Sequence, residues 1–274
     1  MREWISSLSF SELLGVVLAA CVSFTALGLA MGYASEAYWQ PRSRTVFAIP
    51  LKPGQLRKEM LGTLIFHALF VPALAGAIAS GAISFSSGWM AEILGFFGPW
   101  YGFMTFYYFL HRAMHHPRLF WMHRWHHVSM VTTPMTGFSM HPAEAAGWLV
   151  GMLGPCIVLS QLDLLGFWGF VAWLSITWSG NIAGHANAEL FPLRSSRLTT
   201  VLSNPISYHS LHHARFTGHY GFVAAFMDRL FGTEFADWKE VHDRVYDGQP
   251  MTSLRHRGPS YAIPSHPSQE PTHE

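Results

Sequence analysis

The sequence has few charged residues and almost no cysteine. Asp, Glu, Lys and Arg make up 12% of its 274 residues, whereas a soluble domain carries about 25%. The formal net charge is +1, so the basic surplus of a nucleic-acid-binding protein is missing. Cys21 and Cys156 both lie in apolar runs, which excludes a disulfide framework and a thiolate metal cluster. Half of the residues are hydrophobic, and together these features indicate a membrane protein.

Apolar runs recur along the chain and predict membrane helices. They cover residues 13–32, 61–83, 89–110, 145–159 and 165–183. The first run is long enough to cross a bilayer, which takes about 20 residues. A signal peptide is the alternative for this run, but only Arg2 supplies positive charge before it, and the run is long for a signal. The last two runs are expected to form a hairpin that passes through, or nearly through, the bilayer.

Positive charges predict which side of the membrane each loop faces. The polar loop 40–59 is rich in Arg and Lys, and basic residues recur after His185, among them Arg194, Arg197 and Arg215. By the positive-inside rule, these segments face the cytoplasm. Segment 111–144 then lies on the same side. The lone His67, inside the second run, is expected to be a packed structural residue.

Histidines are concentrated at the ends of the predicted helices. Residues 111–127 hold six of the 17 histidines. They include pairs three or four residues apart, which share one face of a helix. Similar spacings return near His185 and in residues 209–213. The candidate metal ligands are His111, His115, His123, His126, His127, His185, His209, His212 and His213. Nine ligands are too many for one ion, which takes three or four, and about right for two.

Several alternatives accompany this interpretation. His116 could replace His115, although His115 keeps the spacing of four from His111. His141 and Glu144 could cap a helix or support metal ligands. A haem protein would place single histidines deep inside its spans, and a metal transporter would place polar ligands along the membrane interior. Imidazole binds iron, zinc and copper alike, so ligand type does not choose the metal.

The histidine motifs carry a family resemblance. His-Arg-Ala-Met-His at 111–115, Leu-Phe-Trp-Met-His-Arg-Trp-His-His at 119–127 and His-Ser-Leu-His-His at 209–213 resemble the fatty acid hydroxylase / sterol desaturase superfamily. The likeness extends to segments beginning at Gly184, Tyr220 and Met227, and covers about residues 95–235. The family's metal ligands fall on the nine histidines. One departure is Asn181, where some members carry a histidine. The His141–Glu144 element resembles the sterol-modifying branch.

The resemblance implies an all-α membrane bundle with a cytosolic helical cap that holds a di-metal site. It implies two iron ions, replaceable by zinc in purified protein, with O2 as co-substrate. The expected reaction is hydroxylation of a lipid C–H bond, the lipid being sterol-like, fatty acyl or sphingoid. Alternatives are desaturation, lipid cleavage or, outside enzymes, metal transport. Asn181, Glu144 and Asp228 are the candidate catalytic residues, and Glu189 is a further partner for the ligands.

The chain itself offers no redox cofactor site. No G-x-G-x-x-G follows a predicted strand, and the cysteines cannot hold an iron–sulfur cluster. We therefore expect a separate ferredoxin- or cytochrome-type electron donor with its reductase. The predicted organisation is an N-terminal helix and basic loop in 1–60, a hydroxylase-like domain in 61–248 and a mobile tail in 249–274. The compact chain without a terminal retrieval signal leads us to expect a bacterial inner membrane. Oligomeric state leaves no trace in the sequence.

Overall fold

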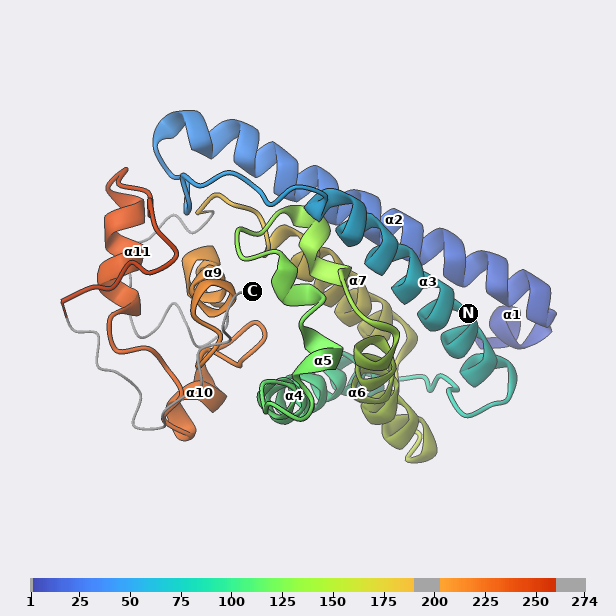
Figure 1. The fold of residues 1–274 in the computed structure, drawn as a ribbon. Helices are drawn as coiled ribbons and strands as arrows, with labels where there is room; N and C mark the ends of the chain where they lie inside the picture. Colours follow the sequence, from blue (N-terminus) through green and yellow to red (C-terminus); the bar gives the residue numbers. More distant parts are fainter. Residues whose placement is uncertain (1, 190–202, 260–274) are drawn as a thin grey trace.

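The chain folds into a bundle of long helices, with the short helices of its C-terminal part gathered at one end (Figure 1). The computed structural model describes residues 2–189 and 203–259. The short helix α1, Arg2–Ser7, comes first. The long helices of the described ranges are α2 (Phe10–Trp39), α3 (Gln55–Ala79), α4 (Trp89–Met114), α6 (Pro142–Gln161) and α7 (Phe167–Ala183). These ranges contain isolated β-bridges and no strand. The predicted all-α bundle is confirmed.

The starts of two helices follow from local sequence. Ser9 caps α2: its hydroxyl accepts a hydrogen bond from the Glu12 backbone N–H, and the Glu12 carboxylate accepts one from the Ser9 N–H. This reciprocal pair satisfies two N–H groups that would otherwise lack a partner at the helix start. His141 caps α6 by accepting from the Ala143 N–H, and Pro142 occupies the first helical position. His141 is therefore a helix cap, one of the two roles that the sequence left open.

The bundle has the character of a membrane protein. Helices α2, α3 and α6 are long and apolar enough to cross a membrane. Large apolar side chains also point outward from α4 and α7, for example Phe97, Phe109 and Ile176. Such an exposed apolar surface is unusual for a soluble protein and suits contact with lipid. Whether α4 and the 17-residue α7 cross fully stays a prediction.

Glycines allow close contact between α7 and its neighbours. A Cβ built on Gly169 would lie 2.0 Å from the carbonyl oxygen of Glu92 on α4. The Gly169 N–H also donates to the Glu92 carboxylate at 2.7 Å. On the other side of α7, a Cβ on Gly28 of α2 would lie 2.8 Å from Ile182 Cβ. Small residues that let two backbones approach are typical of helix packing in membranes.

The short helices form two groups. α5 (Phe120–His123) and the 3-10 helices η2 (His126–Val128) and η3 (Pro134–Phe138) connect α4 to α6. The helices α9 (Ile206–Arg215), α10 (Phe226–Leu230) and α11 (Trp238–Tyr246) lie together at the end of the bundle near the C-terminal end of α2 (Figure 1). We call α9–α11 the end cap. It has a hydrophobic core of its own, which includes Phe47, Leu211 and Trp238.

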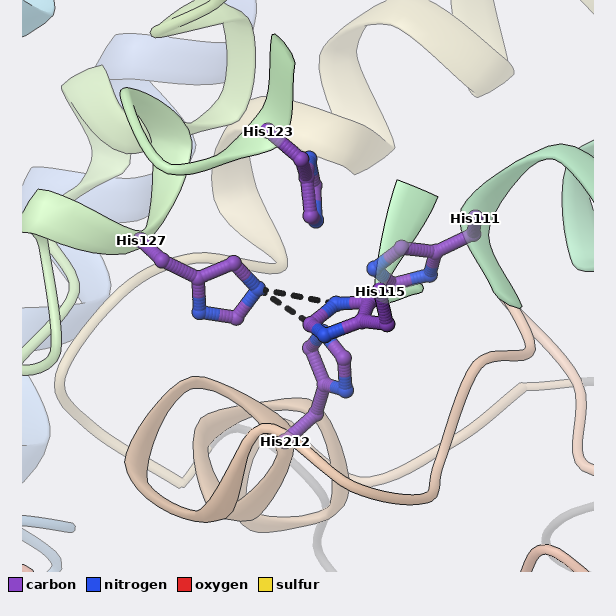
Figure 2. Close-up of side chains that lie close together, drawn as sticks. All are labelled: His111, His115, His123, His127 and His212. Carbon is purple, nitrogen blue, oxygen red and sulfur yellow. Dashed lines mark hydrogen bonds between the residues drawn. The ribbon is translucent and has the colours of Figure 1, made fainter. Parts of the chain in front are cut away.

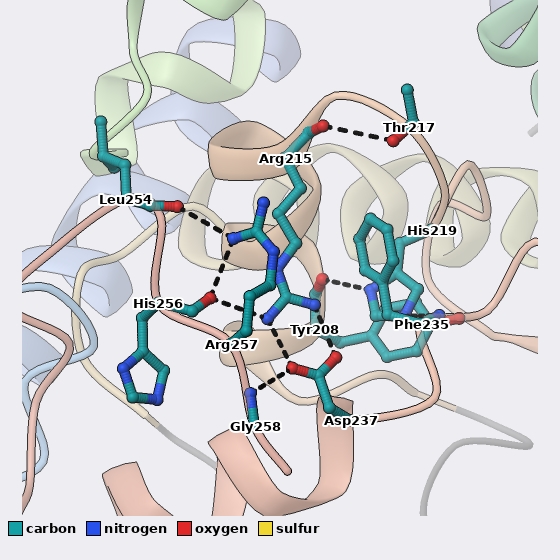
Figure 3. A network of polar contacts seen from close by, with 10 residues as sticks. All are labelled: Tyr208, Arg215, Thr217, His219, Phe235, Asp237, Leu254, His256, Arg257 and Gly258. Atoms are coloured by element: carbon teal, nitrogen blue, oxygen red, sulfur yellow. Dashed lines mark hydrogen bonds and ion pairs between the residues drawn. The ribbon is translucent and has the colours of Figure 1, made fainter. Parts of the chain in front are cut away.

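A buried ion pair ties the end cap together (Figure 3). Arg215, the last residue of α9, donates to both carboxylate oxygens of Asp237 at 2.6 and 2.8 Å. The Gly258 N–H donates to the same carboxylate, and Arg215 also donates to the His256 carbonyl at 3.1 Å. Two-pronged Arg–carboxylate pairs fix orientation as well as distance. The Arg215–Asp237 pair therefore fixes the position of α9, the helix that carries His209, His212 and His213.

Some predicted boundaries differ from the structure. Helix α3 begins at Gln55, so the basic loop is shorter than 40–59. Residues 249–259, assigned to the tail, pack on the end cap, and Met251 is buried and exchanges backbone hydrogen bonds with Val46 and Ala48. Residues 260–274, with His266 and His273, lie outside the described residues, as do Arg194 and Arg197.

The contact between α4 and α7 yields a paired test of the fold. Gly169→Ala should lower the free energy of unfolding by about 1–3 kcal/mol, because the added methyl meets the Glu92 backbone. Gly180→Ala on the same helix meets nothing within 4 Å and should be neutral or stabilising by up to about 1 kcal/mol, since Ala is the better helix former. Thermal unfolding in detergent, followed by circular dichroism, measures both. Equal melting temperatures for the two variants would contradict this packing.

Candidate metal centre

The nine predicted ligands come together as two neighbouring groups. The first cluster contains five histidines and the second contains four. In each group the ring nitrogens lie within 4.8 Å of one another, close enough for the group to hold a metal ion. The first cluster is His111, His115, His123, His127 and His212, and the second is His126, His185, His209 and His213.

Adjacent histidines supply one ring to each cluster. His126 and His127 separate in this way on η2, and His212 and His213 separate on α9. Successive residues on a helix point about 100° apart, so a neighbouring pair can serve two sites side by side. The ring centroids of His126 and His213 are 4.6 Å apart, and those of His127 and His212 are 4.8 Å apart. Each ring thus lies close to a ring of its own cluster. Because the two residues of an adjacent pair are neighbours in the chain, each pair also joins one cluster to the other.

Hydrogen bonds on the outer side of the rings fix their orientation. His111 Nδ1 donates to the Tyr220 carbonyl at 2.9 Å, and His212 Nδ1 donates to the Gly218 carbonyl at 2.7 Å. His185 Nδ1 donates to the Asn181 carbonyl at 2.6 Å. A carbonyl can only accept, so Nδ1 carries the proton and Nε2 of the neutral ring keeps its lone pair. Nε2 is therefore the atom through which each of these rings could bind a metal ion.

The inner nitrogens are spaced like ligands of one ion (Figure 2). His127 Nε2 lies 3.2 Å from His115 Nε2 and 3.1 Å from His212 Nε2. In the second cluster, His209 Nε2 lies 3.0 Å from His185 Nε2 and 3.1 Å from His213 Nε2. Two nitrogens bound to one ion at about 2.0–2.1 Å are separated by about 3.0–3.4 Å. The Nε2 atoms of His111 and His123 are buried with no hydrogen-bond partner, as expected of atoms that face a cation. The donor set therefore fits metal ions.

Burial keeps these rings neutral. It lowers the pKa of His123, His127, His209 and His213 well below the usual value, and the neighbouring imidazoles lower it further. The same burial lowers the pKa of His185 and His212 to about 4. A group whose folded pKa lies below neutral pH is deprotonated there, and a metal ligand must be deprotonated. At neutral pH, metal ions therefore meet no competing protons on these rings.

The predicted catalytic residues surround the clusters without entering them. Glu144 accepts a hydrogen bond from His123 Nδ1 at 2.7 Å. The Asn181 side-chain amide donates to the Gly137 carbonyl at 2.6 Å, while the Asn181 carbonyl orients His185. Asp228 accepts from the backbone N–H groups of Tyr220 and Gly221, so it acts on His111 only through Tyr220. Burial raises the pKa of Asp228 to about 6.

Other residues differ from expectation. Glu189 accepts from the backbone at the start of α9 and from His242, so it contacts no ligand ring in these bonds. His219 and His242 lie outside the histidine motifs and are expected from sequence to be ordinary surface residues, yet both are completely buried. His219 stacks on Tyr208 at 3.5 Å and accepts from the Phe235 N–H, a structural role inside the end cap (Figure 3). His116 is exposed, whereas His115 is a member of the first cluster, which supports the preference for His115.

Sequence reasoning missed the residues that act through their backbone. The carbonyls of Gly218 and Tyr220 orient His212 and His111, and no side-chain pattern marks them. It also missed Glu59, a completely buried carboxylate on α3. The spacing of four between Gln55 and Glu59, followed by hydroxyl residues soon after His127, is the one signal that could have drawn attention to it.

A cavity adjoins the second cluster. It has a volume of about 230 Å³, and its lining includes Met31, Asn181, His185, His209 and Phe222. A separate apolar groove of about 490 Å³ runs between α4 and α6 and is lined by Phe106 and Pro155 among others. Only the cavity has cluster histidines in its lining. The cavity therefore borders the second cluster, with Met31 of α2 and Asn181 of α7 in its wall.

Comparison with known proteins agrees with the site. The fatty acid hydroxylase family model matches residues 96–233, a range that includes all nine histidines. A very-long-chain aldehyde decarbonylase of Oryza sativa subsp. indica, GL1-4, is 32% identical over 154 residues, which are 53% of this chain and 24% of that protein. The very-long-chain aldehyde decarbonylase CER1 of Arabidopsis thaliana is 33% identical over 149 residues, 52% of this chain and 23% of its own length.

The curated relatives are much longer than the region they share with this chain. This chain spans about a quarter of the length of these curated relatives. The relatives are plant proteins, so they give no support to the expected bacterial origin. No solved structure matches the chain. The family model, however, covers just over half of the sequence and the complete histidine centre. The chain therefore belongs to the fatty acid hydroxylase family.

Proposed function

We propose that the chain is a membrane di-iron oxygenase that oxidises a C–H bond of a lipid by hydroxylation. The observation that carries the proposal is the pair of buried, neutral histidine clusters beside a cavity among apolar helices. Two iron ions held by the nine histidines would supply activation of O2 and oxidative attack on an unactivated C–H bond. Family membership supports lipid oxidation but does not distinguish among its outcomes.

The residues of the chain orient, shield and support this centre. Glu144 holds the His123 ring through its Nδ1–H, which also makes that ring a stronger base. Asn181 holds His185 through its backbone and η3 through its side chain. Burial of the clusters excludes water from the reacting carbon. Met31 and Phe222 give the cavity an apolar wall for a lipid chain. The aromatic-rich stretch Phe96–Phe109 suggests, from sequence alone, that substrate enters there, whereas the cavity favours entry beside α2 and α7.

Alternative reactions share the same centre. The relatives named aldehyde decarbonylases favour a lipid-cleaving reaction as the second candidate, and desaturation differs from hydroxylation only after the C–H bond has broken. A metal transporter is less well supported, because the histidines gather in two compact clusters rather than along a path. Among lipids, the preference for a sterol-like substrate was based on the His141–Glu144 element. Since His141 caps α6, that support is reduced.

We further propose that an electron donor docks where the basic residues lie. Arg118 and Arg124 are exposed on either side of α5, the helix that ends at His123. Such a cationic surface attracts an acidic redox protein and raises its association rate. By the same positive-inside argument, this surface faces the cytoplasm.

Metal analysis and oxygen uptake test the proposed function. The purified chain in detergent should contain two metal ions, and with iron and a ferredoxin or cytochrome reductase system it should couple O2 uptake to an oxidised lipid. Zinc in place of iron would leave the proposal standing, because histidine sites accept zinc readily. Lipid profiles of a host with and without the gene identify the product. One ion or none, together with no oxidised lipid, would favour transport instead.

Single ligand variants should separate chemistry from folding. His126→Ala and His212→Ala should each reduce lipid oxidation by at least about 100-fold while keeping the helical content, since membrane helices satisfy their own backbone hydrogen bonds. The control is His256→Ala: only the His256 carbonyl contacts Arg215, and the side chain lies away from both clusters. Product formation by mass spectrometry and circular dichroism provide the measurements. Near-normal turnover by either ligand variant would count against the site.

Charge reversal tests donor docking. The double variant Arg118→Glu/Arg124→Glu should raise the KM for an acidic donor about 10-fold or more and leave kcat nearly unchanged, because steering acts on encounter. Adding salt should raise the KM of the unaltered chain towards that of the variant. Arg255→Glu, also exposed but on the C-terminal segment, is the matched control. A KM that responds equally to both charge reversals would argue against this surface.

A further inference from the structure

A buried carboxylate on α3 is the centre of a hydrogen-bond network that reaches the metal site. Glu59 is completely buried. Its Oε1 accepts from Gln55 Nε2 at 2.8 Å, from Ser129 Oγ at 2.7 Å and from Thr136 Oγ1 at 2.8 Å. Its Oε2 accepts from Thr133 Oγ1 at 2.8 Å. These four donors are neutral, and a buried carboxylate needs such bonds to offset its lost hydration.

Three of the donors lie on the segment that follows the second histidine motif. Ser129, Thr133 and Thr136 come from residues 129–136, directly after His126 and His127. Gln55 also donates to the Val131 carbonyl at 2.8 Å. Gln55 and Glu59, one turn apart on α3, thus form hydrogen bonds with four residues on one side of this segment. The segment has little regular structure of its own beyond η2 and η3, so these contacts decide where it lies.

A second arm of the network continues to α7. Thr136 precedes Gly137, whose carbonyl accepts from Asn181 Nδ2 at 2.6 Å. The Asn181 carbonyl accepts from His185 Nδ1 at 2.6 Å. The contact is tight, since a Cβ on Gly137 would lie 3.0 Å from Ile182 Cα. Displacing η3 would therefore disturb the end of α7 that carries His185.

The two clusters depend on this network unequally. In the second cluster, His126 lies just before the segment that Glu59 holds, and His185 is oriented by the arm through Asn181, so two of the four ligands are involved. In the first cluster only His127 lies next to the segment, while four ligands come from elsewhere or have their own anchors, such as Glu144 for His123. Loss of the Glu59 carboxylate should therefore disturb the second cluster more than the first.

We propose that Glu59 is a positioning residue that sets the metal affinity of the second cluster. It acts through hydrogen bonds to Ser129, Thr133 and Thr136, without touching a ligand. The inference rests on the proposed metal centre and adds to it a residue outside the histidine motifs.

Titration of the metal-free full chain with Co²⁺, followed by visible absorption, tests the inference without turnover. Unaltered protein should bind two Co²⁺ ions. Glu59→Ala should weaken one of them about 10–100-fold, the usual effect of losing a residue that supports ligands, and leave the other unchanged. Glu59→Gln should recover most of the affinity, because its amide has the same shape and can accept from these hydroxyls. Thr136→Val removes one arm and should give a smaller loss in the same site, which keeps the test usable if Glu59→Ala folds poorly.

Two controls assign the effect. In a His209→Ala background, which disables the second cluster, Glu59→Ala should leave the remaining Co²⁺ affinity unchanged. Ser160→Ala removes a buried hydroxyl that accepts from the Ser84 N–H at 2.8 Å near the far end of α6, and should alter neither site. An equal loss at both sites, an unchanged second site, or a Glu59→Gln variant as weak as Glu59→Ala would overturn the inference. Unaltered protein that binds fewer than two Co²⁺ ions would instead contradict the proposed function itself.

Discussion

Nine imidazoles, eight buried and one half-buried, share one small volume, and this crowding is the constraint on which the rest of the structure depends. Outward hydrogen bonds fix the proton on Nδ1 of His111, His185 and His212, so their Nε2 lone pairs face inward. Lone pairs held about 3 Å apart repel one another unless protons or a cation lie between them. Burial depresses the pKa of the rings and so disfavours protons. A cation relieves the repulsion, and its binding free energy then stabilises the folded chain.

The bundle supports this arrangement by fixing where two helices end. His111 lies in the last turn of α4, and His185 follows the end of α7. The close approach of Gly169 to Glu92 sets the spacing of these helices near their other ends. In lipid, apolar side chains gain little free energy by packing against one another instead of against lipid. Close backbone contact is therefore an effective way to fix helix position. Packing at one end of the bundle thus governs ligand geometry at the other.

Local patterns in the sequence predicted the candidate ligands. The residues that the sequence did not predict owe their positions to contacts between distant parts of the chain. Offsets of three and four residues placed His111, His115 and the later triplets on helix faces, and all nine candidate ligands are in the clusters. No local pattern shows that Gly218 and Tyr220 carbonyls face two of the rings, because backbone acceptors have no residue preference. Glu59 was assigned to a loop because the residues before it are polar and basic, yet α3 already begins at Gln55. His219 and His242 were expected at the surface because nothing nearby in sequence foretells the end cap that buries them.

Asn181 shows how one side chain can shape the centre without joining either cluster. The family resemblance places a histidine here in some members, and the structure places Asn181 beside the second cluster and in the wall of the cavity. Its amide nitrogen donates to the Gly137 carbonyl, so the side chain fastens η3 to α7 rather than adding a fifth ring. The second cluster consequently has four histidines where the first has five. Since only second-cluster rings line the cavity, the smaller ligand set is the one that borders it. Asn181 thus leaves the second cluster smaller than the first and next to the cavity, whereas the larger first cluster has no ring in the cavity wall.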